Sequence, residues 1–526
     1  MRDFQAPGRS LVLAQGGMAA TSHPLASQVA IQTLQAGGNA VDGALAAAAV
    51  LPLCEPHMCG LGGDCFALIQ PGDGGAMIGL NASGRAPAGL NGADLRAQGF
   101  AQMQPTEAHS VTVPGAVAGF VTLSQDHGRL SLADAWAPAI RYAEAGVPVA
   151  PRVASDWTGK VDRLQGIARD HYLMQGAAYP LGALFKAPGQ AALLSQIAKD
   201  GREAFYTGPV AQDMVDALQA AGGTHTAEDF AAQTADYVTP IAGTYRGHTL
   251  TELPPNGQGA IALLMLNILE RFDMGALDPM SPEKLHIEME AIKVAYDART
   301  RFIADADHMT RLDHLLSPQT ADQLAALIDP KRALPGPPSP TEHVHKETVY
   351  LTVVDGDGMM VSLIYSIYDS FGSGLAAPGT GILFHNRGSG FTLDEGHPNE
   401  AGPGKRPMHT IIPAMLDLPT GGRMSFGVMG GSYQAAGHAR FVSNMVDYGM
   451  DPQEAMDHPR MFFEDGQTRL ENRYPVESLA ALRALGHQNV VHVTDPIGGS
   501  QAILRGQTGL LTGASDPRKD GCALGY

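Results

Sequence analysis

Two short stretches in the second half of the chain have the hydrophobic pattern of β-strands. Residues 349–354 (VYLTVV) and 360–367 (MVSLIYSI) are rich in β-branched and aromatic side chains, and a Gly-Asp-Gly turn separates them. Runs of this length and composition on either side of a tight turn are typical of a β-hairpin. A second pair of strands is predicted at 66–69 and 76–80, around a Pro-Gly-Asp-Gly-Gly turn.

Other stretches repeat their apolar residues at helical spacing. Residues 25–35 and the alanine-rich 41–53 predict two closely packed helices near the start of the chain. Residues 261–272 and 282–302 predict two more, the second with Glu and Lys on its outer face. The long stretch 131–235 is mostly helical in pattern. The sequence therefore predicts a protein that mixes helices and strands.

The segment Asn256 to Gly259 (NGQG) precedes one of these helices and has two glycines. A phosphate-binding loop would also carry a Lys-Ser/Thr pair, and a dinucleotide fingerprint would have a third glycine. Neither is present, so we interpret the segment as the turn that starts the helix.

Composition indicates a compact soluble chain. The 526 residues are 44% hydrophobic and 17% charged, and 63 of them are glycine, which suits a large core with many tight turns. The net charge of −18, without a basic run, argues against nucleic acid or an anionic membrane as a partner. Neither a signal-peptide pattern at the start nor 18 consecutive apolar residues occurs, so we expect a cytoplasmic location.

Four cysteines are present, at Cys54, Cys59, Cys65 and Cys522. Four and five residues separate the first three, whereas structural zinc sites commonly place two residues between paired cysteines. We interpret these thiols as small buried hydrophobes and predict neither a metal site nor a disulfide.

Thr348 is the strongest candidate for chemistry. It lies between a Pro/His-rich connector, residues 334–347, and the first strand of the predicted hairpin. Because proline cannot donate a backbone hydrogen bond, the connector should stay outside regular structure and be accessible to cleavage. Cutting the Glu347–Thr348 bond would place a free α-amine, with a reference pKa of roughly 7.7–8.0, beside the threonine hydroxyl. The amine would then serve as the base of an N-terminal nucleophile, although threonine is also a common structural residue at the start of a strand.

A colinear series of short motifs runs through nearly the whole chain. On these motifs the chain resembles the γ-glutamyltransferase family of N-terminal nucleophile hydrolases. The motifs are GGNAVD at 37–42, EPHMCGLGG at 55–63, TVYLTVVD at 348–355, FGSG at 371–374, PGTGIL at 378–383, KRP at 405–407, MGGS at 429–432 and GASDPR at 513–518.

The resemblance implies a fold and an organisation. The expected fold class is α+β, a four-layer αββα sandwich with a largely helical region in its first part. Cleavage would yield a large subunit, residues 1–347, and a small subunit, residues 348–526, which stay together as one globular unit. It also implies a small-molecule amide substrate, no cofactor, and a possible homodimer of processed heterodimers.

The resemblance also assigns roles around the nucleophile. Thr348 would attack the amide carbonyl and form an acyl-enzyme ester, with its own amine as base. Ser366, on the second strand of the hairpin, would orient the threonine hydroxyl. Gly430 and Gly431 would supply the backbone N–H groups of an oxyanion hole.

The substrate pocket departs from the family pattern. Ser83 stands at the position of the family's carboxylate-binding arginine, and Arg85 follows two residues later. Ser389 and Gly390 stand where acidic residues would hold the α-ammonium of a glutamyl group. Because a buried ammonium without a counter-charge is costly, such a pocket should favour acyl groups that lack the amine.

We therefore expect an amide whose acyl part carries a carboxylate, such as an oxamate-like or glutaryl-like group. The segments NASGRAP (81–87) and KRPMHTIIP (405–413) resemble the branch that holds glutaryl-cephalosporin acylases and oxamate amidohydrolases. Two alternatives stay open: a γ-glutamyltransferase or glutathione hydrolase, and an uncleaved, inactive binding protein. The arginines could equally form structural ion pairs. The candidate substrate-binding residues are Ser83, Arg85, Tyr368, Asn386, Arg387, His409 and Thr410.

Overall fold

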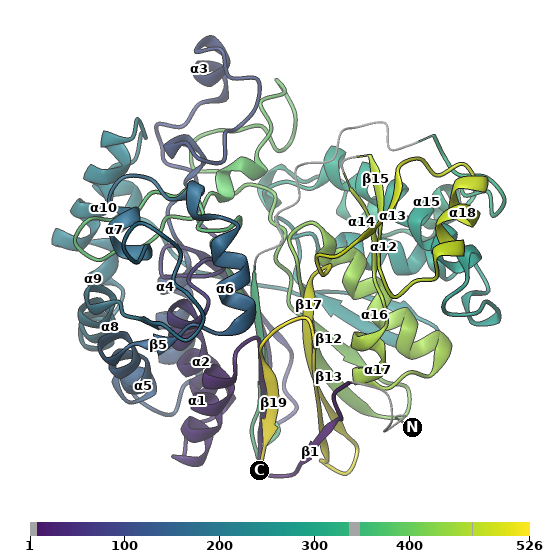
Figure 1. Ribbon diagram of the computed structural model, residues 1–526, viewed down its shortest axis with the longest axis horizontal. Helices are drawn as coiled ribbons and strands as arrows, with labels where there is room; N and C mark the ends of the chain where they lie inside the picture. The colour runs from purple at the N-terminus through teal and green to yellow at the C-terminus, as the bar shows by residue number, and fades with distance from the viewer. Residues whose placement is uncertain (1–7, 336–347, 465) are drawn as a thin grey trace.

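Two seven-stranded sheets lie face to face between two layers of helices (Figure 1). The computed structural model describes residues 8–335, 348–464 and 466–526. Apolar side chains between the sheets, among them Phe66, Tyr350 and Met415, form one core, and each sheet shares a second core with its own helices. The predicted four-layer αββα class is thereby confirmed.

The first sheet is antiparallel throughout and contains strands from both halves of the chain. Helices α12 (Gly259–Leu269) and α16 (Tyr433–Tyr448) cover its outer face. In spatial order its strands are β1 (Val12–Ala14), β18 (Leu511–Ser515), β17 (Gly499–Gly506), β13 (Gly422–Met429), β12 (Ala414–Asp417), β9 (His248–Glu252) and β8 (Ile241–Tyr245).

The second sheet is also antiparallel and has the predicted hairpin at its centre. A strand from before residue 348, β2, lies between β19 and β10, which follow that residue, so the two predicted subunits interleave within one sheet. In spatial order the strands are β19 (Cys522–Gly525), β2 (Met18–Thr21), β10 (Val349–Val354), β11 (Met360–Ser366), β3 (Asp64–Gln70), β4 (Ile78–Ala82) and β7 (Asp236–Val238).

The helical layer on this second sheet is built on α1 (Pro24–Gln35) and α2 (Ala40–Cys54). Asn39 and Asp42 form a capping box at the start of α2, and every residue of that helix is buried. The other elements in this first part of the chain are α3 (Gly92–Ala97), α4 (Ala116–His127), α5 (Leu132–Ala145), α6 (Pro151–Thr158), α7 (Ala168–Tyr172), α8 (Pro188–Asp200), α9 (Glu203–Tyr206), α10 (Gly208–Ala220), α11 (Ala227–Ala231), β5 (Val147–Pro148) and β6 (Leu184–Phe185).

The layer on the first sheet is dominated by the long helix α13 (Pro282–Phe302). Helix α12 begins at Gly259, the last residue of the NGQG segment, and ends three residues earlier than its apolar pattern. The other elements are α14 (Leu312–Leu315), α15 (Pro318–Ala325), α17 (Pro452–Asp457), α18 (Val476–Ala484), β14 (Met461–Glu464), β15 (Gln467–Glu471) and β16 (Val490–Val493). Short 3-10 turns are Ala108–Ser110, Val161–Arg163, Met274–Ala276, Ala306–His308 and Arg387–Gly390.

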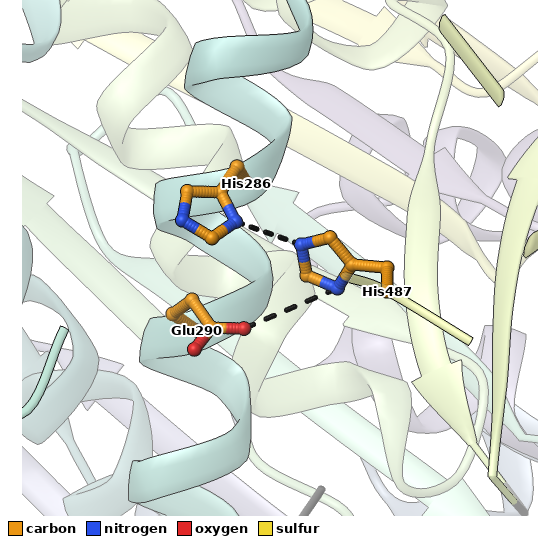
Figure 2. A group of neighbouring side chains, drawn as sticks. All are labelled: His286, Glu290 and His487. Atoms are coloured by element: carbon orange, nitrogen blue, oxygen red, sulfur yellow. Dashed lines mark hydrogen bonds and ion pairs between the residues drawn. The ribbon is translucent and has the colours of Figure 1, made fainter. Parts of the chain in front are cut away.

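A buried group of side chains joins α13 to the loop after α18 (Figure 2). His286 Nδ1 lies 2.7 Å from His487 Nε2. Glu290 Oε1 accepts from Lys293 Nζ at 2.7 Å, and its Oε2 accepts from the backbone N–H of Leu334 at 2.8 Å. Two imidazoles and a carboxylate are a common metal donor set, but here each already bonds a protein partner. We describe the group as a cross-link between residues on the two sides of Thr348.

The thiols of Cys54, Cys59 and Cys65 are buried in the core between the second sheet and its helices, and burial raises the pKa of the Cys65 thiol above its usual range. They pack as small hydrophobes, as predicted. Among the described residues, no helix has both the length and the apolar character needed to cross a membrane.

Candidate active site

Thr348 lies one residue before β10, at the end of the central hairpin, and is 1% exposed. Val349 pairs with Tyr365, so the next position in the register places Thr348 opposite Ser366. The two hydroxyl oxygens are 3.4 Å apart, with the threonine as donor. Ser366 Oγ also accepts from the backbone N–H of Tyr368 at 2.7 Å. The structure thus brings together the predicted nucleophile and its predicted orienting residue.

The other side of the predicted cleavage bond, Glu347, lies outside the described residues. The predicted subunit boundary between residues 347 and 348 therefore stays a prediction.

Gln434 is a second side chain at the nucleophile, and the sequence did not predict it. Its Nε2 lies 3.5 Å from Thr348 Oγ1. Its Oε1 accepts from the backbone N–H of Ile412 at 3.1 Å, and the side chain is fully buried. Gln434 belongs to the first turn of α16, which also begins beside the diglycine.

Gly430 and Gly431 connect β13 to α16 in a turn that only glycine adopts readily. Their φ angles are +130° and +57°, and a Cβ on Gly430 would lie 2.9 Å from the Cα of Gly498. Both carbonyls accept bonds from the first turn of α16: Tyr433 N donates to Gly430 at 3.1 Å and Gln434 N donates to Gly431 at 3.2 Å. The positive end of the α16 dipole faces this turn, which favours a nearby oxyanion.

Gln258, in the turn before α12, connects this diglycine to the pocket wall. Its Nε2 donates to the carbonyls of Thr410 at 2.7 Å and of Gly431 at 3.2 Å. Its Oε1 accepts from the buried guanidinium of Arg299 at 3.1 Å. The NGQG segment is thus the predicted helix-start turn and, in addition, a support of the site.

Arg387, Tyr368 and Thr410 form one group among the predicted substrate-binding residues. The buried guanidinium of Arg387 lies over the Tyr368 ring, 3.8 Å from its centroid, and donates to Thr410 Oγ1 at 2.9 Å. Tyr368 has a φ of +78°, which is uncommon for a residue with a Cβ. Because Ser366 accepts from the N–H of Tyr368, the hydroxyl beside the nucleophile also holds this tyrosine. A planar, permanently charged guanidinium in this position suits a carboxylate.

His409 is held in place by the protein around it. Its Nε2 lies 3.1 Å from Asp64 Oδ2, and its Nδ1 accepts from the N–H of Ile411 at 3.3 Å. Burial and the nearby charge of Arg387 lower the pKa of His409 to about 3, so the imidazole is neutral near pH 7. The ring, with both nitrogens engaged, forms part of the pocket wall, and its predicted role in substrate binding stays a prediction.

Asp64 is the buried carboxylate that holds this wall. It accepts from the N–H groups of Gly84 at 2.9 Å and Gly115 at 3.2 Å, and it lies 3.4 Å from His385 Nδ1. Although burial by itself would raise it, the pKa of Asp64 is held far below its ordinary value by His385 and His409. The carboxylate is ionised, and it fixes three segments that are distant in the sequence.

Ser83 and Asn386 are buried in hydrogen-bond networks with their neighbours. Ser83 Oγ donates to Asn81 Oδ1 at 2.7 Å and accepts from Asn256 Nδ2 at 3.2 Å. Asn386 accepts from the N–H of Asp369 at 3.2 Å and donates to the carbonyl of Pro105 at 3.1 Å. Both side chains position the chain around the pocket.

Arg85 is paired with protein carboxylates, and its predicted role in substrate binding stays a prediction. Its side chain is 39% exposed and lies 3.6 Å from Asp236 and 3.7 Å from Asp305, and it donates to the carbonyl of Gly404 at 3.1 Å. Arg406 shares the same Asp236, at 2.8 Å. The two acids come from remote parts of the chain, which explains why the local sequence did not reveal the pairing.

An acidic side chain does lie beside the pocket, although Ser389 and Gly390 replace the expected acids. Asp369 follows Tyr368 directly and is 3% exposed. It forms an ion pair with Arg163, and its Oδ1 accepts from the N–H of Ser370 at 2.9 Å. In this arrangement its charge is balanced by protein rather than held for a substrate ammonium.

Comparisons with known proteins agree with this geometry. The family model described as Gamma-glutamyltranspeptidase matches residues 26–526. The glutathione hydrolase-like YwrD proenzyme of Bacillus subtilis is 36% identical over 97% of this chain and 98% of its own length. The oxamate amidohydrolase proenzyme of Klebsiella pneumoniae is 36% identical, again over 97% of this chain and 98% of its own length.

Among solved structures, a cephalosporin acylase from Bacillus halodurans superimposes with a TM-score of 0.91 at 39% identity, covering 100% of this chain and 99% of its own. The proenzyme names of the relatives indicate precursors that are cleaved into two subunits. Enzymes of this kind are hydrolases and acyltransferases that act on amide bonds. With a family match over nearly its whole length, this chain belongs to the gamma-glutamyltranspeptidase family.

Proposed function

We propose that this protein is a self-processing N-terminal threonine amidohydrolase that cleaves amides with a small acidic acyl group, oxamate-like or glutaryl-like. One observation carries the choice of acyl group. The guanidinium of Arg387 is buried and lies over the ring of Tyr368. Tyr368 is two residues beyond Ser366, which contacts the nucleophile.

The reaction follows from the contacts at Thr348. Cleavage of the precursor frees its α-amine, which takes the hydroxyl proton as Oγ1 attacks the amide carbonyl. Ser366 holds the oxygen before attack, and the N–H groups of Gly430 and Gly431 receive the oxyanion. The C–N bond then breaks, the amine leaves with the proton, and water releases the acid from the ester.

The acidic acyl preference rests on charge. A carboxylate of the acyl group would pair with Arg387, and Thr410 orients that guanidinium. A glutamyl substrate would bring an ammonium as well, and Ser389 and Gly390 offer it no charge. The carboxylate of Asp369 is engaged by Arg163, so binding an ammonium there would disrupt a buried ion pair.

A γ-glutamyl amide is the second candidate substrate. The glutathione hydrolase-like relative is as similar to this chain as the oxamate amidohydrolase is, at 36% identity. Asp369 is the side chain that would have to serve it, after release from Arg163.

A substrate panel with matched arginine variants tests the proposal. Oxamate, a glutaryl amide, a γ-glutamyl amide and a neutral acyl amide are compared by amine or ammonia release. Arg387→Gln should lower kcat/KM for the acidic amides by about 10- to 150-fold, because this is the usual effect of losing one hydrogen bond to a charged group. The kcat/KM for the neutral amide should stay nearly unchanged. Arg202→Gln is the control, because Arg202 also lies over a tyrosine ring, Tyr206, at 5.1 Å. Equal losses on acidic and neutral amides, or a γ-glutamyl amide as the best substrate, would contradict the proposal.

A further inference from the structure

We infer that Gln434 acts directly on the nucleophile: its amide N–H holds the Thr348 oxygen and stabilises the negative charge that develops on it. This inference rests on the proposed function and adds a residue to the catalytic group of Thr348, Ser366, Gly430 and Gly431. It starts from the 3.5 Å contact between Gln434 Nε2 and Thr348 Oγ1.

The orientation of the Gln434 amide is fixed by its other end. Oε1 accepts from the backbone N–H of Ile412 at 3.1 Å, and a carbonyl oxygen is the only amide atom that can do so. The NH2 group must therefore face Thr348. Because the side chain is fully buried and belongs to the first turn of the 16-residue helix α16, this donor is held in place by the fold.

The hydrogen bonds at the nucleophile then run in one direction, from Gln434 through Thr348 to Ser366. Gln434 Nε2 donates to Thr348 Oγ1, and Thr348 donates to Ser366 Oγ, which also accepts from the N–H of Tyr368. One donor and one acceptor thus orient the threonine hydroxyl. The 3.5 Å and 3.4 Å separations are long, as catalytic hydrogen bonds often are before substrate is bound.

The position of this donor gives it a role in both halves of the reaction. During attack, the bond from Oγ1 to the carbonyl carbon forms while the hydroxyl proton passes to the α-amine. During hydrolysis of the ester, that bond breaks and Oγ1 takes the proton back. The oxygen is partly negative in both transition states, so an N–H aimed at it lowers both barriers. A preorganised donor of this kind typically contributes about 10²- to 10³-fold in rate.

Gln434→Glu and Gln434→Met test the inference. Glutamate keeps the shape and the acceptor for Ile412 but replaces the NH2 donor with an oxygen, and methionine is similar in size without donor or charge. Gln190→Glu is the matched control, because Gln190 is also a buried glutamine whose Nε2 donates to a hydroxyl, that of Tyr172, at 2.9 Å. Circular dichroism and thermal unfolding establish that each variant is folded, and should glutamate fail to fold, methionine is the deciding variant.

We expect both Gln434 variants to lose about 10²- to 10³-fold in kcat with KM changed less than threefold, while Gln190→Glu keeps the wild-type kcat. Precursor cleavage, followed by intact mass, should slow as well, because it uses the same oxygen. Folded Gln434 variants within threefold of the wild type in kcat and in cleavage rate would overturn the inference. Failure of the proposed function is distinguishable, because then the wild type itself would be uncleaved or inactive on the amide panel.

Discussion

Removing the hydroxyl of Ser366 should affect the nucleophile and the pocket together. In Ser366→Ala, the Thr348 hydroxyl loses its acceptor at 3.4 Å, and the backbone N–H of Tyr368 loses its acceptor at 2.7 Å. Serine at this position is fully buried, so water cannot easily replace the lost oxygen. A buried donor left unpaired costs about 1–3 kcal/mol.

The cost should be felt in catalysis because of the conformation of Tyr368. Its φ of +78° is unfavourable for a residue with a Cβ and persists only while its surroundings hold it. The Tyr368 ring in turn carries the guanidinium of Arg387, 3.8 Å from the ring centroid. A loss of 1–3 kcal/mol in positioning corresponds to a decrease of about 5- to 150-fold in kcat/KM.

The assay is steady-state hydrolysis of an acidic amide by the cleaved enzyme, with thermal unfolding measured in parallel. Ser366→Thr keeps the hydroxyl and should stay closer to the wild type than Ser366→Ala. If Ser366→Ala is folded and cleaved and retains the wild-type kcat/KM, then the hydroxyl positions neither Thr348 nor Tyr368, and the reasoning is refuted.

Two further predictions concern the diglycine and a buried histidine. Gly430→Ala should lower kcat by about 10²-fold or more, because the new Cβ would lie 2.9 Å from Gly498 Cα and displace the N–H donors. Unchanged turnover would exclude Gly430 from the oxyanion hole. Burial lowers the pKa of His225 to about 4, so between roughly pH 6.5 and pH 4 the unfolded chain binds a proton that the folded chain does not. The contribution of His225 to the free energy of unfolding should therefore fall by about 2 kcal/mol between pH 7 and pH 5. In denaturant titrations, the free energy of unfolding of His225→Asn should depend less steeply on pH than that of the wild type. Equal pH dependence in the two proteins would contradict a buried, neutral His225.

Elements with a strong local pattern were predictable from the sequence. The hairpin of β10 and β11 was found from its β-branched residues and its Gly-Asp-Gly turn, and α13 has the predicted bounds, Pro282–Phe302. Helix α12 ends at Leu269 although its apolar pattern continues to residue 272, because helix ends fray and an apolar pattern does not mark them sharply.

The site was predicted only in part, for a physical reason. Motif order located Thr348, Ser366 and the diglycine, and the structure brings the first two into contact. The ion pairs of Arg85 were not predictable, because the two acids lie about 150 and 220 residues further along the chain. Gln434 has no periodic or compositional signature, since a polar residue in the first turn of a helix is ordinary in any sequence.

The central claim, that Thr348 becomes the chain terminus that performs the chemistry, is tested most directly by intact mass. Purified wild-type protein and Thr348→Ala are compared, and each is then assayed for amine release from an acidic amide. We predict two wild-type fragments whose masses meet at the Glu347–Thr348 bond, with turnover, and a single uncut, inactive chain for the variant. A wild-type chain that stays uncut and inactive, or a Thr348→Ala variant that is cleaved and turns over substrate like the wild type, would contradict the claim.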